Sequence, residues 1–142
     1  MPASKNAQHS SETYINRELS LLEFHKRVLA QAKDEKHPLL ERLNFLIIFS
    51  RNLDEFFEVR VAGLMKQVDL NTITTAPDNI PNEVVLEQIS ETAHQAIAEQ
   101  YEILNDVLFP ELQKYGIRFI QHQDILEKHH EWLRNYFLKQ IQ

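Results

Sequence analysis

The sequence contains no cysteine, and this absence excludes disulfides, thiolate metal sites and cysteine nucleophiles. Glycine is also scarce, because the 142 residues include only Gly63 and Gly116. Tight hairpins and phosphate-binding loops depend on glycine, so the chain lacks a P-loop and a Rossmann fingerprint, and a strand-and-turn fold is disfavoured. No apolar run approaches the roughly 20 residues that a membrane span requires.

Basic residues are fewer than acidic ones, with 15 lysines and arginines against 21 aspartates and glutamates, which gives a formal net charge of -6. An acidic chain is expected to be a poor general binder of nucleic acid or of any other polyanion. The hydrophobic fraction of 43% is ordinary for a globular domain with a core. Residues 1–13 are polar, lack an apolar signal segment and are interpreted as a disordered tail.

Hydrophobic periodicity predicts an all-α protein, an antiparallel helical bundle with one long helix. The expected helices cover residues 20–36, 38–49, 52 to about 68, 82–115, and 124 to the end, with a short strand at 117–120. Ser20 and Asn52 are the expected N-caps of the first and third helices, and Asp124 that of the last.

Three residues are expected to shape the helices. Pro110 predicts a kink or break in the long helix, and Gly116 predicts its end. Gly63 falls inside a predicted helix, where it costs about 1 kcal/mol relative to alanine, and close helix packing is the favoured explanation.

The last predicted helix carries a wide apolar surface, made of Ile125, Leu126, Trp132, Leu133, Tyr136, Phe137 and Ile141. An exposed surface of this kind usually marks a missing partner. Packing back onto the preceding helices is the alternative. We therefore expect residues 117–142 to begin a second, truncated domain.

Two Glu-x-x-His pairs, Glu91 with His94 and Glu127 with His130, resemble the motif of di-iron bundles. At ~100° per residue, however, Glu91 points roughly 150° and Glu127 roughly 140° away from the apolar stripe of its own helix. Metal ligands must project into the bundle. We therefore interpret both pairs as surface residues and predict no metal site and no catalytic residue.

Aromatic residues and one amide gather between residues 45 and 60, among them Phe45 and Asn52. An aromatic face can stack on a purine, and an asparagine amide can pair with a base edge. Core aromatics and an N-cap asparagine explain the same residues without any ligand, so composition alone leaves both interpretations open.

The segments Asn16-Arg-Glu-Leu-Ser20, Pro38-Leu-Leu-Glu-Arg-Leu43, Ser50-Arg-Asn-Leu-Asp-Glu-Phe-Phe57 and Val59-Arg-Val-Ala-Gly63 carry a family resemblance. Together they resemble the amino-terminal domain of polyphosphate kinase, the family that works through a phosphohistidine. The likeness is dense to residue 63, and the amino-terminal domain is expected to cover residues 14–116. Residues 117–142 are similar to the start of the family's head domain. Leu21 and His25 depart from the family, which often has tryptophan and asparagine there.

The resemblance implies an enzyme that reversibly transfers the terminal phosphate of ATP to polyphosphate, with magnesium bound outside this chain. None of the seven histidines here matches the phosphorylated histidine. The resemblance assigns Asn52 to the nucleotide, with Phe45 on its adenine side. It also implies the remaining domains of the same polypeptide as partners, a homo-oligomer, and a cytoplasmic location, with peripheral membrane association left open. The isolated chain is expected to be inactive.

A non-enzymatic alternative remains, in which the chain is a helical interaction module that docks a partner through its last helix. The apolar surface of residues 125–141 is the feature that supports it.

Overall fold

The computed structural model describes residues 16–70 and 80–141. The predicted tail at 1–13 and most of the segment between the third and fourth predicted helices lie outside these residues. The chain divides into two compact units, residues 1–108 and 109–142, and each is described by itself. The domain boundary expected after Gly116 therefore stays a prediction.

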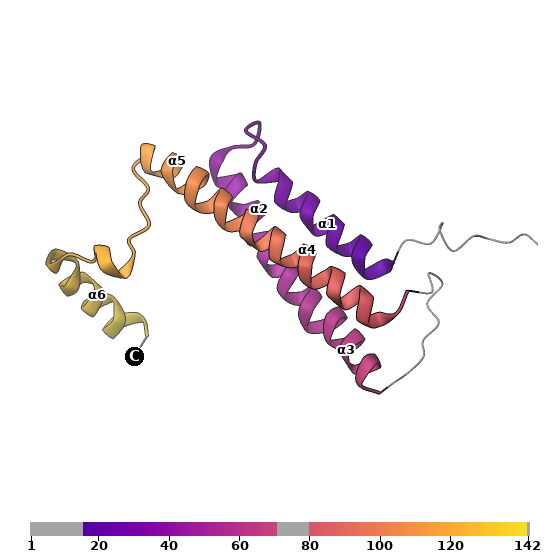
Figure 1. Cartoon of the computed structure of the whole chain (residues 1–142). Helices are drawn as coiled ribbons and strands as arrows, with labels where there is room; N and C mark the ends of the chain where they lie inside the picture. Colours follow the sequence, from indigo (N-terminus) through magenta and orange to yellow (C-terminus); the bar gives the residue numbers. More distant parts are fainter. Residues whose placement is uncertain (1–15, 71–79, 142) are drawn as a thin grey trace, which may run out of the picture. The chain divides into compact units, whose positions relative to one another are not determined.

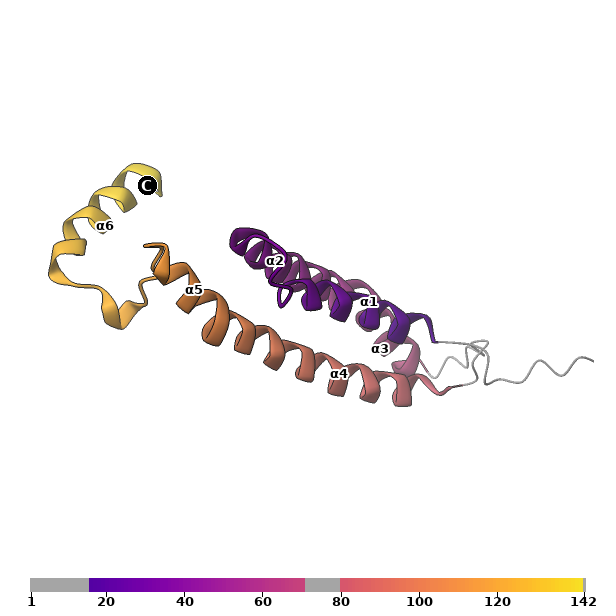
Figure 2. The ribbon, with the colours of Figure 1, turned by 90° about the horizontal axis from the view of Figure 1, so that it is seen from above.

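The first unit is an antiparallel helical bundle, as the hydrophobic pattern predicts. It contains α1 (Arg17–Gln31), α2 (Leu39–Glu55), the π-helix η2 (Phe56–Val61), α3 (Ala62–Asp69), α4 (Asn82–Glu102) and the π-helix η3 (Ile103–Leu108). Figures 1 and 2 show α1, the run from α2 to α3, and α4 lying side by side. The core between them is apolar and comprises, among others, Leu22, Leu29, Leu46, Phe49, Leu53, Val85, Ile89 and Leu108.

The first helix begins earlier than predicted. Asn16, not Ser20, is its N-cap, because the Asn16 side-chain oxygen accepts hydrogen bonds from the backbone N–H groups of Glu18 (3.0 Å) and Leu19 (3.2 Å). Glu23, the residue that would complete a capping box with Ser20, pairs instead with Lys26 at 2.9 Å. Leu19 packs against the core, and this burial favours a helix that includes the turn before Ser20.

The predicted break between the second and third helices is wrong. α2, η2 and α3 follow one another without a break from Leu39 to Asp69, so Asn52 lies inside α2 and caps nothing. Leu46, Phe49, Leu53 and Phe56 form one buried stripe through the expected break. Burying each such side chain contributes about 1.5–3 kcal/mol, which outweighs the small helix-propensity penalty of an asparagine.

The long helix predicted at 82–115 is present as α4, η3 and α5 (Phe109–Lys114). The irregularity associated with Pro110 precedes that residue, because the helix changes to π geometry over Ile103–Leu108. A proline removes one N–H donor and crowds the carbonyl four residues earlier, and a π-turn changes the hydrogen bonding there.

The second unit contains α5, the short 3-10 helix η4 (His122–Asp124) and α6 (Glu127–Gln140). Gly116 follows α5 with a φ of 79°, in agreement with its predicted role at the helix end. The strand expected at residues 117–120 does not form, and no strand occurs in the described part of the chain. Asp124 does not cap α6, since Ile125 and Leu126 are extended and the helix begins at Glu127.

Candidate functional site

Asn52 lies on the solvent side of the α2 core stripe and is half-buried. It lines a shallow hollow together with Ile48, Arg51, Asp54, Glu55 and Glu58. Among the described residues, no other side chain hydrogen-bonds to the Asn52 amide, so the amide keeps its capacity to donate and to accept.

The hollow around Asn52 is acidic, because Asp54, Glu55 and Glu58 outnumber Arg51. Such a surface repels phosphate groups, whereas an uncharged ring with donors and acceptors on its edge suits it. The residues do not fit a metal ion either, since no group of three or more histidine, aspartate or glutamate side chains arranged for metal binding occurs in the described ranges.

Phe45 lies seven residues before Asn52 on α2. At ~100° and ~1.5 Å per residue, the two share one side of the helix and lie about 10 Å apart along its axis. Phe45 is half-buried and does not line the hollow. Its ring packs against His37, with 5.2 Å between ring centroids, so part of its surface is already covered.

Ile48 lies between these two residues, and the sequence did not single it out. It is 38% exposed and lines the hollow with Asn52. The segment from Leu43 to Phe49 is almost continuously apolar, a pattern typical of a helix buried nearly all round, yet Ile47 and Ile48 are both exposed. Helical spacing from Leu46 and Phe49 could have placed Ile48 outside the core.

His25 packs beside this part of α2. It is buried, and its ring meets the edge of the Phe56 ring at 5.9 Å between centroids. Its Nδ1 atom has no hydrogen-bond partner among the described residues. Burial lowers the pKa of the His25 imidazole below its ordinary value of 6.5, and the negative charge of Glu55 opposes that shift. The buried environment therefore favours the neutral form of His25.

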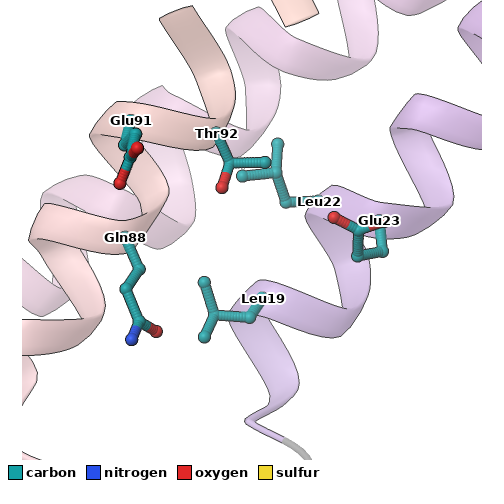
Figure 3. Close-up of a pocket in the computed structure, with 6 residues that line it drawn as sticks. All are labelled: Leu19, Leu22, Glu23, Gln88, Glu91 and Thr92. Carbon is teal, nitrogen blue, oxygen red and sulfur yellow. The ribbon is translucent and has the colours of Figure 1, made fainter. Parts of the chain in front are cut away.

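Glu91 lines a second hollow between α1 and α4, shown in Figure 3 with Leu19, Leu22, Glu23, Gln88 and Thr92. Leu22 and Thr92 point toward each other at its centre, while Glu91 is exposed, as the helical geometry predicted. His94 is tied to its own helix, because its Nδ1–H donates to the carbonyl oxygen of Ser90 at 2.7 Å. The Nδ1 atom of His94 is therefore occupied within its own helix.

The last helix, α6, has no buried residue. Trp132 and Tyr136 stack on each other, with ring centroids 5.3 Å apart, and remain 65% and 51% exposed. Leu133, Phe137, Leu138 and Ile141 extend the apolar surface predicted from the sequence. No helix in the described ranges is long and apolar enough to cross a membrane.

Comparison with known families and proteins gives one consistent result. Residues 14–120 match the family described as the polyphosphate kinase N-terminal domain. The chain is 53% identical over 131 residues to a polyphosphate kinase of Pseudomonas putida, covering 92% of this chain and 18% of that protein. It is 42% identical over 127 residues to a polyphosphate kinase of Burkholderia cenocepacia, covering 89% of this chain and 18% of that protein.

A solved structure agrees with these matches. The crystal structure of polyphosphate kinase from Porphyromonas gingivalis superposes with a TM-score of 0.70 and 34% sequence identity. The superposition covers 91% of this chain and 18% of that chain. The chain therefore spans less than a fifth of the length of these relatives.

Proposed function

The chain belongs to the polyphosphate kinase family, as its amino-terminal domain, and we propose that it covers the adenine side of ATP in such an enzyme. The enzyme would transfer the terminal phosphate of ATP to polyphosphate, reversibly and through a phosphohistidine outside this chain. The observation that carries the proposal is the half-buried Asn52 amide, which lines an acidic hollow with no side-chain partner among the described residues.

The chemistry of the hollow favours a base over a phosphate. An asparagine amide matches the edge of adenine, because it can accept from the exocyclic amino group and donate to a ring nitrogen. Ile48 offers an apolar side chain next to this amide, and Phe45 offers the uncovered part of its ring further along α2. The carboxylates of Asp54, Glu55 and Glu58 disfavour the triphosphate here, so we place it toward other domains.

Phosphoryl transfer needs charge neutralisation and in-line positioning of the reacting groups. The described residues offer no fitting magnesium site, so we assign magnesium to the remainder of the enzyme. The role of this domain is then to hold the base, which orients the nucleotide without touching the reacting phosphorus. The remaining domains of the polypeptide are its partners, within a homo-oligomeric, cytoplasmic enzyme.

The test is Asn52→Ala in the full-length kinase, with Asn44→Ala as the matched control. Asn44 is an exposed asparagine on the same helix, two turns before Asn52. Loss of a bidentate base contact of about 1–3 kcal/mol predicts a KM for ATP raised by about 5-fold to 150-fold, and a weaker preference for ATP over GTP. Unchanged KM and base preference in Asn52→Ala would remove the assignment, and an equal loss in Asn44→Ala would show a general effect on the helix.

The isolated chain provides a second test. Incubated with γ-labelled ATP and magnesium, it should incorporate no label and form no polyphosphate. A labelled histidine in the chain would contradict the proposal that the reactive histidine lies elsewhere.

A second candidate function is partner docking through α6, and its exposed Trp132 and Tyr136 favour it. Replacing both by alanine should leave the thermal stability of the isolated chain nearly unchanged, because their surface is already in water. In the full-length kinase the same change should lower thermal stability or disrupt assembly. Equal behaviour of the variant and the wild type in the full-length protein would exclude an interface at α6.

A further inference from the structure

Three arginines from separate stretches of the chain line one hollow of the first unit. Arg17 is the first residue of α1, Arg27 lies ten residues further along the same helix, and Arg60 comes from η2. Ser20, Leu21 and Phe24 form the floor between them, and Glu18 supplies the one acidic side chain of the lining. The lining of this hollow therefore carries more positive than negative charge, although the chain as a whole is acidic.

These three guanidinium groups are not neutralised within the fold. All three arginines are exposed, and none forms an ion pair with a carboxylate in the described part of the chain. The lysines Lys26 and Lys33, in contrast, each pair with a glutamate. Arginines in a structural role usually find a carboxylate or a carbonyl oxygen, as Arg42 does.

One of the three is oriented by an aromatic ring. The guanidinium carbon of Arg27 lies 5.6 Å from the centroid of the Phe24 ring. This cation–π contact restricts the arginine side chain and leaves its N–H donors free at the edge of the plane. Phe24 is 47% exposed, so its ring lies at the surface, where it contacts Arg27, and does not belong to the buried core.

The spacing of the arginines indicates the shape of the ligand. Arg17 and Arg27 are ten residues apart on α1, which separates their Cα atoms by about 15 Å along the helix axis. A single phosphate ion reaches one or two of the guanidinium groups, whereas a chain of several phosphoryl groups reaches all three. We propose that the hollow formed by Arg17, Arg27 and Arg60 binds a linear chain of phosphoryl groups, separately from the base-binding hollow at Asn52.

The identification of this ligand as inorganic polyphosphate rests on the proposed function. The expectation that the three arginines bind an extended anion does not. The net charge of -6 predicted poor binding of polyanions. At physiological salt, charges more than about 8 Å apart are largely screened, so a bound anion responds to the nearby arginines more than to the chain average. On this proposal, the local arrangement of the arginines outweighs the net charge of the chain.

The experiment measures binding of end-labelled polyphosphate to the 142-residue chain by fluorescence anisotropy, in competition with unlabelled long polyphosphate, tripolyphosphate and orthophosphate. The double variant Arg27→Gln/Arg60→Gln is compared with Arg118→Gln/Arg134→Gln, which removes the same charge from exposed arginines of the second unit. The dissociation constant should rise at least about 10-fold in the first variant and less than about 2-fold in the second. Competition should weaken in the order long chain, tripolyphosphate, orthophosphate.

A conservative variant separates loss of binding from loss of fold. Arg27→Lys/Arg60→Lys keeps both charges but removes the bidentate donors, so its affinity should lie between those of the wild type and the glutamine variant. The absence of polyphosphate binding by the wild-type chain would overturn the proposal, as would equal losses in both glutamine variants or equal competition by all three phosphates. An acidic protein segment would then be the better occupant.

The two proposals fail independently. Asn52→Ala should leave polyphosphate binding by the isolated chain unchanged, because Asn52 does not line the arginine hollow. If Asn52→Ala leaves the ATP kinetics unchanged while the arginine variant loses polyphosphate, only the adenine assignment is lost.

Discussion

Arg42 of α2 reaches back to the end of α1, where its Nε–H donates a hydrogen bond of 2.8 Å to the carbonyl oxygen of Ala32. Both residues are buried, and Ala32 is the C-cap of α1. The last carbonyl groups of a helix have no partner within the helix. Here the buried Arg42 side chain of α2 supplies the missing donor for one of these carbonyl groups. The bond connects the end of α1 to α2.

Removal of this bond should destabilise the bundle. Arg42→Met keeps most of the side-chain volume but leaves the Ala32 carbonyl oxygen without its donor, which costs about 1–3 kcal/mol of unfolding free energy. Arg51→Met, at an exposed position on the same helix, should stay within about 0.5 kcal/mol of the wild type. Urea denaturation of the three proteins measures both values, and similar stabilities would show that the bond is not needed.

The N-cap of α1 can be tested in the same way. Asn16→Ala should lower the unfolding free energy by about 1 kcal/mol, because the backbone N–H groups of Glu18 and Leu19 lose their acceptor. Ser20→Ala should have almost no effect, since Ser20 lies within the helix and is exposed. A larger loss in Ser20→Ala than in Asn16→Ala would restore the helix start inferred from the sequence.

The two glycines should respond to alanine in opposite directions. A Cβ atom at Gly63 would meet nothing within 4 Å, so the close helix packing expected there is absent. Gly63→Ala should therefore stabilise α3 by about 0.5–1 kcal/mol. Gly116 also has open space, but its φ of 79° disfavours any side chain, so Gly116→Ala should destabilise the end of α5. Thermal melts followed by circular dichroism distinguish the two signs.

The buried His25 should make stability depend on pH. Because burial lowers its pKa in the folded state, the unfolded chain binds a proton more readily. The contribution of neutral His25 is fully present above about pH 6.5 and is lost progressively as the pH falls below that value. His25→Asn removes the titration and should flatten the slope of unfolding free energy between pH 6.5 and 5.

The control for this experiment is His94→Asn, at an exposed histidine of α4. A change of slope shared by both variants would reflect the loss of a histidine in general and not the burial of His25. If His25→Asn keeps the slope of the wild type, another group is responsible for it.

The sequence alone determined the helical class, the antiparallel bundle, the long fourth predicted helix, its end at Gly116 and the apolar surface of the last helix. These features follow from local periodicity and from residues whose backbone preferences act over a few positions. The family also followed from local order, because each of its motifs is a short unbroken segment between residues 16 and 63.

Only the tertiary structure decided where the helices begin and whether they break. Ser20 and Asn52 have side chains suited to N-caps, yet both residues lie inside helices that begin earlier than predicted. Burial of the large apolar side chains around them stabilises these longer helices by more than the ~1 kcal/mol that an N-cap contributes. The convergence of Arg17, Arg27 and Arg60 on one hollow was also invisible in the sequence. It depends on α1 packing beside η2, where the ring of His25 contacts that of Phe56, and no local pattern encodes a contact between residues so far apart in the sequence.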